Sequence, residues 1–241
     1  LLKSSHDIYK NVQALFDLAY ATNDMELNYE VRKICAEKSQ KFKKDRPEHA
    51  EKYRQLYKNT LLFAAPVDFD SFCRYIEWNR EPSKRFYLPR RKQLKVVVDA
   101  LQELADDKLD LLAISMPPGV GKTTIAIFYL AWMGGRVPNL PMLGGSHSNS
   151  FLRGVYDEVL RVIDKDGEYL WHDVFPNIAI SNTNAKDMRI DLDKSQRFET
   201  FEFSSIGSGN AGKVRAGTLL YCDDLVDGIE TAMSKERLDK L

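Results

Sequence analysis

The chain has 241 residues, of which 44% are hydrophobic and 29% are charged, which suits one large domain or a core with a smaller appendage. No apolar run approaches the roughly 18 residues that a membrane span needs, and three widely spaced cysteines argue against a disulfide framework or a zinc site. The net charge is zero, but residues 1–98 carry +7 and residues 99–241 carry −7, an asymmetry that either a nucleic-acid-binding face or solvated helix surfaces would explain.

The first eighty residues have the pattern of successive helices, because their apolar residues recur at helical spacing. Pro47 suits the first turn of one helix, and Asp68 can cap the start of another. Prolines then interrupt the pattern within Arg80–Pro89. We therefore expect an all-helical N-terminal subdomain over residues 1–85. The N-terminus has neither a secretory nor a transit composition, which predicts a cytoplasmic protein without a membrane partner.

From Arg90 onward, helical and strand patterns alternate. In chain order, the expected elements are a helix through 94–104, a buried parallel strand at Leu111–Ser115, a loop at Met116–Gly121, a helix at Lys122–Met133, a strand around Pro141–Gly145, a helix from Ser148 to Ile163, a hairpin of Met188–Leu192 and Arg197–Phe203 turning at Lys194-Ser195, and a strand at Thr218–Cys222. This order predicts an α/β core over residues 86–241, with a mostly parallel, helix-flanked sheet and functional groups at the carboxyl ends of its strands.

The loop is the strongest functional signal, because the segment Met116–Thr123 has the pattern of a P-loop (Walker A) between a strand and a helix. Gly121 lets the backbone close around phosphate oxygens, and Lys122 can reach the β- and γ-phosphates. The Thr123 hydroxyl can ligate Mg²⁺, although Met116 replaces the usual first glycine. A plain Gly/Pro turn would not require Lys-Thr directly after Gly, so we expect ATP here. The residues expected to bind it are Pro118, Gly119, Val120, Gly121, Lys122, Thr123 and Thr124.

An NTPase also needs acids at the end of a neighbouring strand, and the apolar strand at Thr218–Cys222 is followed directly by two. Asp223 is the expected acid on the magnesium side, holding the metal through water. Asp224 is the expected group that orients or deprotonates the attacking water. An apolar strand ending in two acids is a weak signal alone, but together with Lys122 it predicts a Mg²⁺-dependent ATP hydrolase.

Several segments together resemble the large terminase subunit of tailed double-stranded DNA phages, a P-loop NTPase of the RecA-like (ASCE) class. The resemblance covers roughly residues 86–241. It rests on the Pro-Pro P-loop, on Gly145-Ser146-His147-Ser148 before an arginine-bearing helix, on the Phe175-Pro176 turn, and on the Gly-rich stretch Gly207–Arg215 followed by Asp223-Asp224 and Glu230-Thr231-Ala232-Met233-Ser234.

The resemblance implies the ATPase motor of viral genome packaging, a bacteriophage protein of the host cytoplasm that drives DNA into an empty procapsid. The implied partners are double-stranded DNA held through its phosphates without sequence preference, the portal protein, the small terminase subunit and further copies of the chain in a ring. Family members continue into an RNase H-like nuclease domain, which these 241 residues do not contain, so no nuclease activity is expected.

The resemblance also implies roles for four further residues. Gln93 matches the position of an adenine-reading glutamine, although an exposed helix residue is an equally good interpretation. Arg153 or Arg161 matches an arginine finger acting on the ATP of a neighbouring subunit, whereas arginines are also common on surface helices. Arg215 matches a nucleotide-sensing position in the Gly-rich stretch.

Two departures from the family pattern leave alternatives open. Gly119 stands where terminases often have an arginine, so no arginine acts in cis there. Asp224 stands where glutamate is common, which leaves Asp227 or Glu230 as alternative bases. The other classes that fit are an AAA+ or superfamily-2 helicase-type ATPase, and a nucleotide-switched DNA-binding or assembly protein. An AAA+ module would place its helical lid after the core and would have Asp-Glu instead of Asp-Asp.

Overall fold

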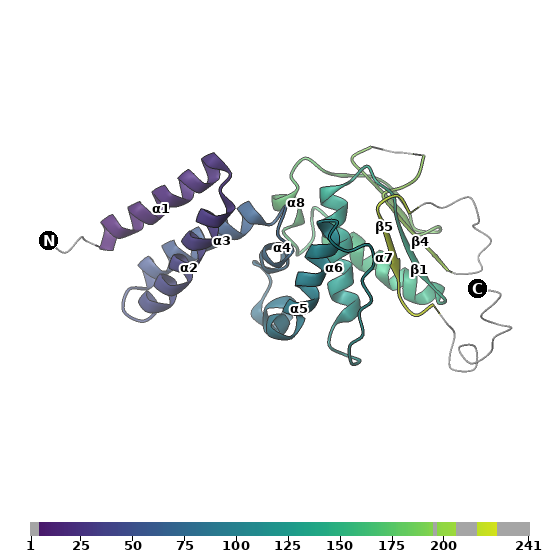
Figure 1. Ribbon diagram of the computed structural model, residues 1–241, viewed down its shortest axis with the longest axis horizontal. Helices are drawn as coiled ribbons and strands as arrows, with labels where there is room; N and C mark the ends of the chain where they lie inside the picture. Colours follow the sequence, from purple (N-terminus) through teal and green to yellow (C-terminus); the bar gives the residue numbers. More distant parts are fainter. Residues whose placement is uncertain (1–4, 195–196, 206–215, 226–241) are drawn as a thin grey trace. The chain divides into compact units, whose positions relative to one another are not determined.

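The computed structural model describes residues 5–194, 197–205 and 216–225. The chain divides into two compact units, Leu1–Asp106 and Asp107–Leu241. The first unit is helical and the second contains a sheet with helices packed on it (Figure 1). A helical N-terminal region followed by an α/β region agrees with the order expected from the sequence.

The first unit consists of helices that begin where the sequence signals place them. Its elements are α1 (Ser5–Thr22), α2 (Met25–Phe42), α3 (Pro47–Ala64), α4 (Phe69–Ile76), the 3₁₀ turn η1 (Pro82–Lys84) and α5 (Tyr87–Ala105). Pro47 occupies the first turn of α3, where its missing N–H costs nothing. The Asp68 carboxylate caps α4 by accepting a hydrogen bond from the Ser71 amide at 3.0 Å.

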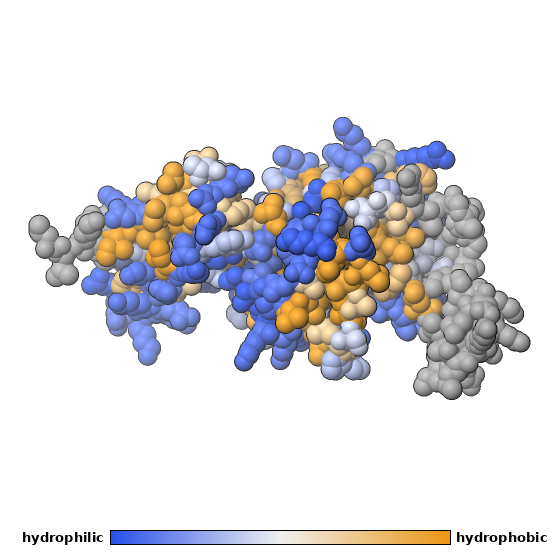
Figure 2. Space-filling view, in the orientation of Figure 1, coloured by the Kyte–Doolittle hydropathy of each residue, from blue (hydrophilic) through white to orange (hydrophobic). Residues whose placement is uncertain are grey.

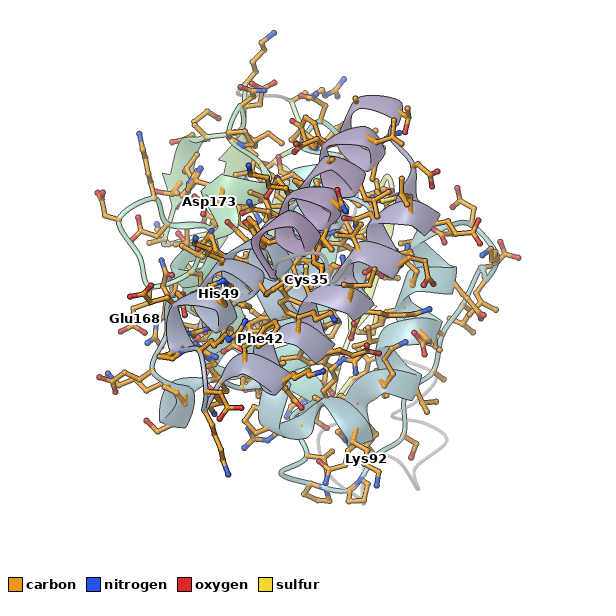
Figure 3. All side chains as sticks on the ribbon, turned by 90° about the vertical axis from the view of Figure 1, so that its left-hand side faces the viewer. Cys35, Phe42, His49, Lys92, Glu168 and Asp173 are labelled. Atoms are coloured by element: carbon orange, nitrogen blue, oxygen red, sulfur yellow. The ribbon has the colours of Figure 1, made fainter. Side chains whose placement is uncertain are left out.

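The core of the helical unit lies between α1, α2 and α3. Its buried residues include Val12, Cys35 and Tyr53, and burial raises the pKa of the Cys35 thiol to about 12. Phe42 of α2 stacks on Tyr53, with 5.9 Å between ring centroids, and also contacts His49 of α3 (Figure 3). Apolar residues also reach the surface of α1 (Figure 2). Those most exposed there are Leu15, Leu18 and Tyr20.

Helix α5 belongs to the helical unit because two buried carboxylates bind its start. Glu77, 1% exposed, accepts hydrogen bonds from the backbone amides of Phe86 and Tyr87, both at 2.8 Å. Asp70 accepts from the Tyr87 hydroxyl and forms a two-point ion pair with Arg91 at 2.8 and 2.9 Å. The compact units therefore divide after Asp106, about twenty residues beyond the boundary that the proline-rich stretch indicated.

Among the described residues, the second unit is built on a five-stranded sheet in the order β2-β3-β4-β1-β5. Its elements are α6 (Lys122–Arg136), β1 (Met142–Ser146), α7 (Asn149–Ile163), α8 (Trp171–Val174), β2 (Ile180–Asn184), β3 (Arg189–Leu192), β4 (Phe201–Ser205) and β5 (Leu219–Cys222). Strand β1 is parallel to β4 and to β5, whereas β2–β3 and β3–β4 are antiparallel. The sheet is therefore mixed, and the expectation of a mostly parallel sheet is wrong.

The segment Leu111–Ser115 forms no strand, which corrects a second expectation. Its side chains alternate between exposed and half-buried, and Leu111 is 84% exposed. An apolar run becomes a buried strand only where a neighbouring strand supplies backbone partners and other elements cover its side chains. In the part of the chain that the structure describes, β5 pairs with β1 and not with this segment.

Helices α6 and α7 pack on the same face of the sheet. Phe201 and Phe203 project from that face of β4 with their rings nearly parallel, 6.5 Å apart. Tyr156 of α7 meets Phe203 edge to face. A Cβ atom on Gly134 of α6 would lie 2.4 Å from Phe201, so this glycine allows the helix to approach β4 closely. Both helices lie beside the sheet in Figure 1.

The hairpin expected around residues 188–203 is present as the antiparallel pair β3–β4, with Ile190 opposite Phe201. Residue 195 of its expected turn lies outside the described residues. Strand β2 extends the pairing and was not anticipated from the sequence. Among the helices that the structure describes, none is long and apolar enough to span a bilayer.

Candidate nucleotide-binding site

The loop before α6 adopts the backbone conformation that its glycines permit. Gly119 and Gly121 have φ angles of 78° and 100°, in the left-handed region that favours glycine. A Cβ atom on Gly119 would meet no atom within 4 Å, so backbone conformation, not crowding, accounts for a glycine at this position. Gly121 is the residue that precedes α6, and Lys122 is the first helical residue.

The start of α6 has no side-chain cap, unlike three other helices of the chain. Asp24, Asp68 and Ser148 each cap the helix that follows them by accepting a backbone N–H. Gly121 has no side chain, and no side-chain cap from the described residues bonds the first turn of α6. The first amides of a helix point outward and carry partial positive charge, so uncapped amides can bind an anion such as a phosphate.

Three polar side chains follow this loop directly. Lys122, Thr123 and Thr124 are half-buried, whereas Ile125 behind them is fully buried. Among the described residues, the Lys122 ammonium has no carboxylate within ion-pairing distance. An unpaired, partly desolvated cation beside uncapped helix amides is a favourable site for an anion.

The acids at the carboxyl end of β5 are held by β1. The backbone amide of Asp223 donates to the Gly145 carbonyl at 3.1 Å. The Asp223 carboxylate accepts a hydrogen bond from the Tyr221 hydroxyl at 3.0 Å. Burial, together with the adjacent Asp223 charge, raises the pKa of Tyr221, so the hydroxyl keeps its proton and remains a donor at neutral pH.

Asp224 occupies an unusual backbone conformation, with φ of 51° in the left-handed region. Its carbonyl oxygen accepts a hydrogen bond from the His147 amide at 3.0 Å and from the Ser146 hydroxyl at 3.2 Å. The Nδ1 atom of His147 lies within hydrogen-bond distance of the same carbonyl and 3.7 Å from the Asp224 carboxylate. The sequence analysis named this segment only as part of the resemblance to terminases and predicted no role for His147.

The loop and the two acids belong to the same compact unit. In the described ranges, no hydrogen bond or ion pair joins Lys122 or Thr123 to Asp223 or Asp224. No three His, Cys, Asp or Glu side chains of the described residues could hold a metal ion among themselves. Thr123 and Asp223 are the residues expected from the sequence to hold Mg²⁺, an ion that usually retains several water ligands and binds one or two carboxylates.

The arginines on α7 differ in their surroundings. The Arg153 guanidinium lies 5.5 Å from the centroid of the Tyr156 ring. Arg161 is exposed and pairs with Glu158 at 3.3 Å and with Glu168 at 3.9 Å. Arg153 thus has no carboxylate partner among the described residues, whereas the charge of Arg161 is partly compensated.

The remaining expected residues lie in the helical unit or outside the described residues. Gln93 is exposed on α5, in the helical unit. Arg215, Asp227, Glu230 and the segment Gly207–Arg215 lie outside the described residues, as does the stretch after Glu230.

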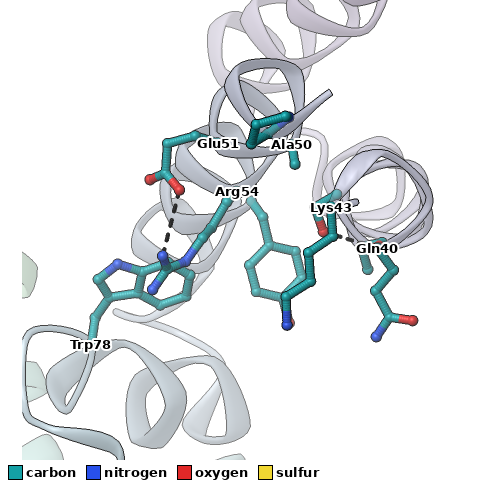
Figure 4. A pocket seen from close by; sticks show the side chains of 10 residues that line it. Gln40, Lys43, Ala50, Glu51, Arg54 and Trp78 are labelled. Atoms are coloured by element: carbon teal, nitrogen blue, oxygen red, sulfur yellow. Dashed lines mark hydrogen bonds and ion pairs between the residues drawn. The ribbon is translucent and has the colours of Figure 1, made fainter. Parts of the chain in front are cut away.

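A groove of about 610 Å³ lies in the helical unit, and none of the residues that line it is one expected to bind nucleotide (Figure 4). It runs between α2 and α3 and reaches Trp78. Arg54 lies 5.5 Å from the centroid of the Trp78 ring and 3.5 Å from the Glu51 carboxylate. Its cations are Lys43 and Arg54, and its remaining lining is small, aromatic or neutral apart from Glu51.

Comparison of the chain with protein-family models, with curated proteins and with solved structures found no match.

Proposed function

We propose that this chain is a P-loop ATPase of the RecA-like type and the motor portion of a terminase large subunit, hydrolysing ATP with Mg²⁺ to move double-stranded DNA into a procapsid. The observation that carries the proposal is the loop before α6. Two glycines at positive φ lead directly into a helix whose first residue is Lys122, which has no carboxylate partner among the described residues. The unit also presents two acids after a strand parallel to β1.

The chemistry begins with binding of the triphosphate. Backbone amides around Gly121 and the first turn of α6 would hold the phosphate oxygens. Lys122 would stabilise the negative charge on the β- and γ-phosphates, since the reaction depends mainly on positioning and charge stabilisation. Pro118, Gly119, Val120 and Thr124 would complete the loop.

The acids would then prepare the attack on the γ-phosphate. Thr123 and Asp223 are the residues that would hold Mg²⁺, which would supply positive charge next to the phosphates. Asp224 would orient the attacking water and accept its proton. The Tyr221 hydroxyl supports the proposed metal-binding role of Asp223, because its hydrogen bond holds the Asp223 carboxylate.

The motor function adds partners to this reaction. Arg153 would act on the ATP of a neighbouring copy in a ring, because it has a cation-π contact to Tyr156 and no carboxylate partner among the described residues. Gln93 would read the adenine and Arg215 would sense the nucleotide. The portal protein, the small terminase subunit and DNA are the further partners of this proposal.

Replacing Lys122 tests the proposal, and an exposed lysine of the same unit offers a matched control. We expect Lys122→Ala to lower Mg²⁺-dependent phosphate release by about 10²-fold or more, because a charge aimed at the transition state is lost. Lys165→Ala removes an exposed lysine just after α7 and should leave turnover unchanged. Release is measured with and without double-stranded DNA, at several protein concentrations, because an arginine acting in trans requires assembly.

Equal turnover in Lys122→Ala and the wild type would show that the loop does not catalyse hydrolysis. ATP binding without turnover under every condition would point instead to a nucleotide-switched protein.

A further inference from the structure

The end of β1 is joined to Asp224 by contacts that lie beyond the β-ladder. The paired residues of β1 and β5 end with Gly145 opposite Cys222. After that pair, the His147 amide, the Ser146 hydroxyl and the His147 ring all converge on the carbonyl oxygen of Asp224. Parallel strands need no such convergence to pair, so these contacts serve the residues that follow the strand.

These contacts hold Asp224 in a conformation that few residues adopt. Its φ of 51° lies in the left-handed region, which Asp tolerates better than most residues other than glycine and asparagine. Such a conformation persists where surrounding contacts over-determine it, and it sets the direction in which the side chain leaves the backbone. The Asp224 carboxylate is 68% exposed, so its own contacts restrain it little.

We propose that His147 is a positioning residue for Asp224, fixing its backbone so that the carboxylate is aimed at the attacking water. The inference rests on the proposed ATPase function and adds a residue to it. Because a carbonyl only accepts hydrogen bonds, the ring must carry its proton on Nδ1. Ser146 supports the same carbonyl, and Ser146 is fully buried.

Substitutions at His147 separate positioning from simple folding. In asparagine the side-chain Nδ2 corresponds to Nδ1 of histidine, so His147→Asn keeps a donor for the Asp224 carbonyl. We expect His147→Ala to lower kcat by about 10- to 100-fold with little change in KM for ATP, since small misplacements of reacting groups have effects of this order. His147→Asn should restore kcat to within about threefold of the wild type.

A second histidine offers a matched control. The His172 ring also bonds a backbone carbonyl, that of Ile163, at 3.0 Å, but at a different place in the same unit. His172→Ala should therefore leave kcat unchanged. If His172→Ala lowers kcat as much as His147→Ala, or if His147→Asn is as slow as His147→Ala, the positioning role is wrong.

The double variant His147→Ala with Asp224→Asn tests whether His147 acts through Asp224. Residues that act as one unit are not additive, so the residual phosphate release of the double variant, measured at high enzyme concentration, should be no slower than that of Asp224→Asn alone. A further loss equal to that of His147→Ala by itself would overturn the inference.

One measurement does not depend on turnover. Nitrogen-15 NMR of the His147 ring should show the proton on Nδ1 in the wild-type protein, and a ring protonated only on Nε2 would overturn the inference. If the wild type hydrolyses no ATP while Nδ1 carries the proton, the proposed function fails and the geometry stands.

Discussion

Glu77 is a buried carboxylate whose partners are mostly backbone. It accepts the amides of Phe86 and Tyr87 and pairs with Arg80 at 2.9 Å. Because the α5 start has no side-chain cap of its own, this carboxylate satisfies amides that would otherwise be buried without partners. Glu77 therefore links α4 to α5.

Replacing Glu77 by glutamine should destabilise the helical unit. The glutamine amide has one accepting oxygen instead of two, so its NH2 group would face a backbone N–H of Phe86 or Tyr87. We expect this to lower the free energy of unfolding by about 1–3 kcal/mol. Urea denaturation followed by far-UV circular dichroism measures the change. Glu81→Gln is the control, because its side chain is 69% exposed and its pair with Lys84 is worth less than about 1 kcal/mol. Equal effects of the two substitutions would show that Glu77 does not stabilise the start of α5.

Replacing each of the two acids after β5 should affect a different part of the reaction. Asp223→Ala should abolish turnover, because the proposed magnesium-side ligand is lost. Asp224→Asn should keep ATP binding while blocking hydrolysis, since asparagine tolerates the left-handed backbone but cannot accept a proton. Binding of a fluorescent ATP analogue and phosphate release measure the two steps separately. Hydrolysis retained in Asp224→Asn would move the base to Asp227 or Glu230.

At the scale of elements, α6 depends on a glycine that contacts another aromatic ring. A Cβ atom on Gly135 would lie 2.2 Å from the Phe175 ring, which is itself buried. We expect Gly135→Ala to lower the free energy of unfolding by about 1–3 kcal/mol, because the ring or the helix must shift. Thermal and urea denaturation measure this change in the free energy of unfolding.

Gly154 of α7 is the matched control for Gly135, since a Cβ atom there meets nothing within 4 Å. Gly154→Ala should raise stability by about 0.5–1 kcal/mol through the better helix propensity of alanine. A destabilising effect at Gly154, or a neutral one at Gly135, would show that the packing of α6 differs from that described.

Elements with strong local signals were predictable from the sequence. Asp68 caps α4 as its position indicated, since a cap depends on a few neighbouring residues. Strand β2 gave no signal because Ile180 is the one apolar residue in Ile-Ser-Asn-Thr-Asn. Strand direction and the failure of Leu111–Ser115 to pair depend on long-range partners, which a local pattern does not specify.

The candidate site, too, was predictable from the sequence only in part. The glycines of the loop were predictable, because a left-handed backbone needs residues such as Gly119 and Gly121. The contact between His147 and Asp224 was not, since 77 positions separate them in the chain. The spacing of motifs indicates which residues are candidates, whereas the sheet decides which of them meet.

At the scale of the whole molecule, the proposed motor must hold DNA without reading it. We expect binding to fall steeply with salt, with a linear decrease of log affinity against log salt, and to be equal for duplexes of unrelated sequence. Fluorescence anisotropy with labelled duplexes at several salt concentrations measures both properties. Preference for one sequence by tenfold or more would count against a packaging motor.

The three cysteines of the whole chain differ in a way that aids such experiments. Burial raises the pKa of all three thiols, but Cys35 and Cys73 are buried and inaccessible to a reagent, whereas Cys222 is exposed. Thiol reagents react with accessible thiolates, so a maleimide dye should attach selectively at Cys222 in the native protein. The dye would sit one residue from Asp223, at the end of β5, and would report spectroscopically on nucleotide and metal arrival without any engineered residue.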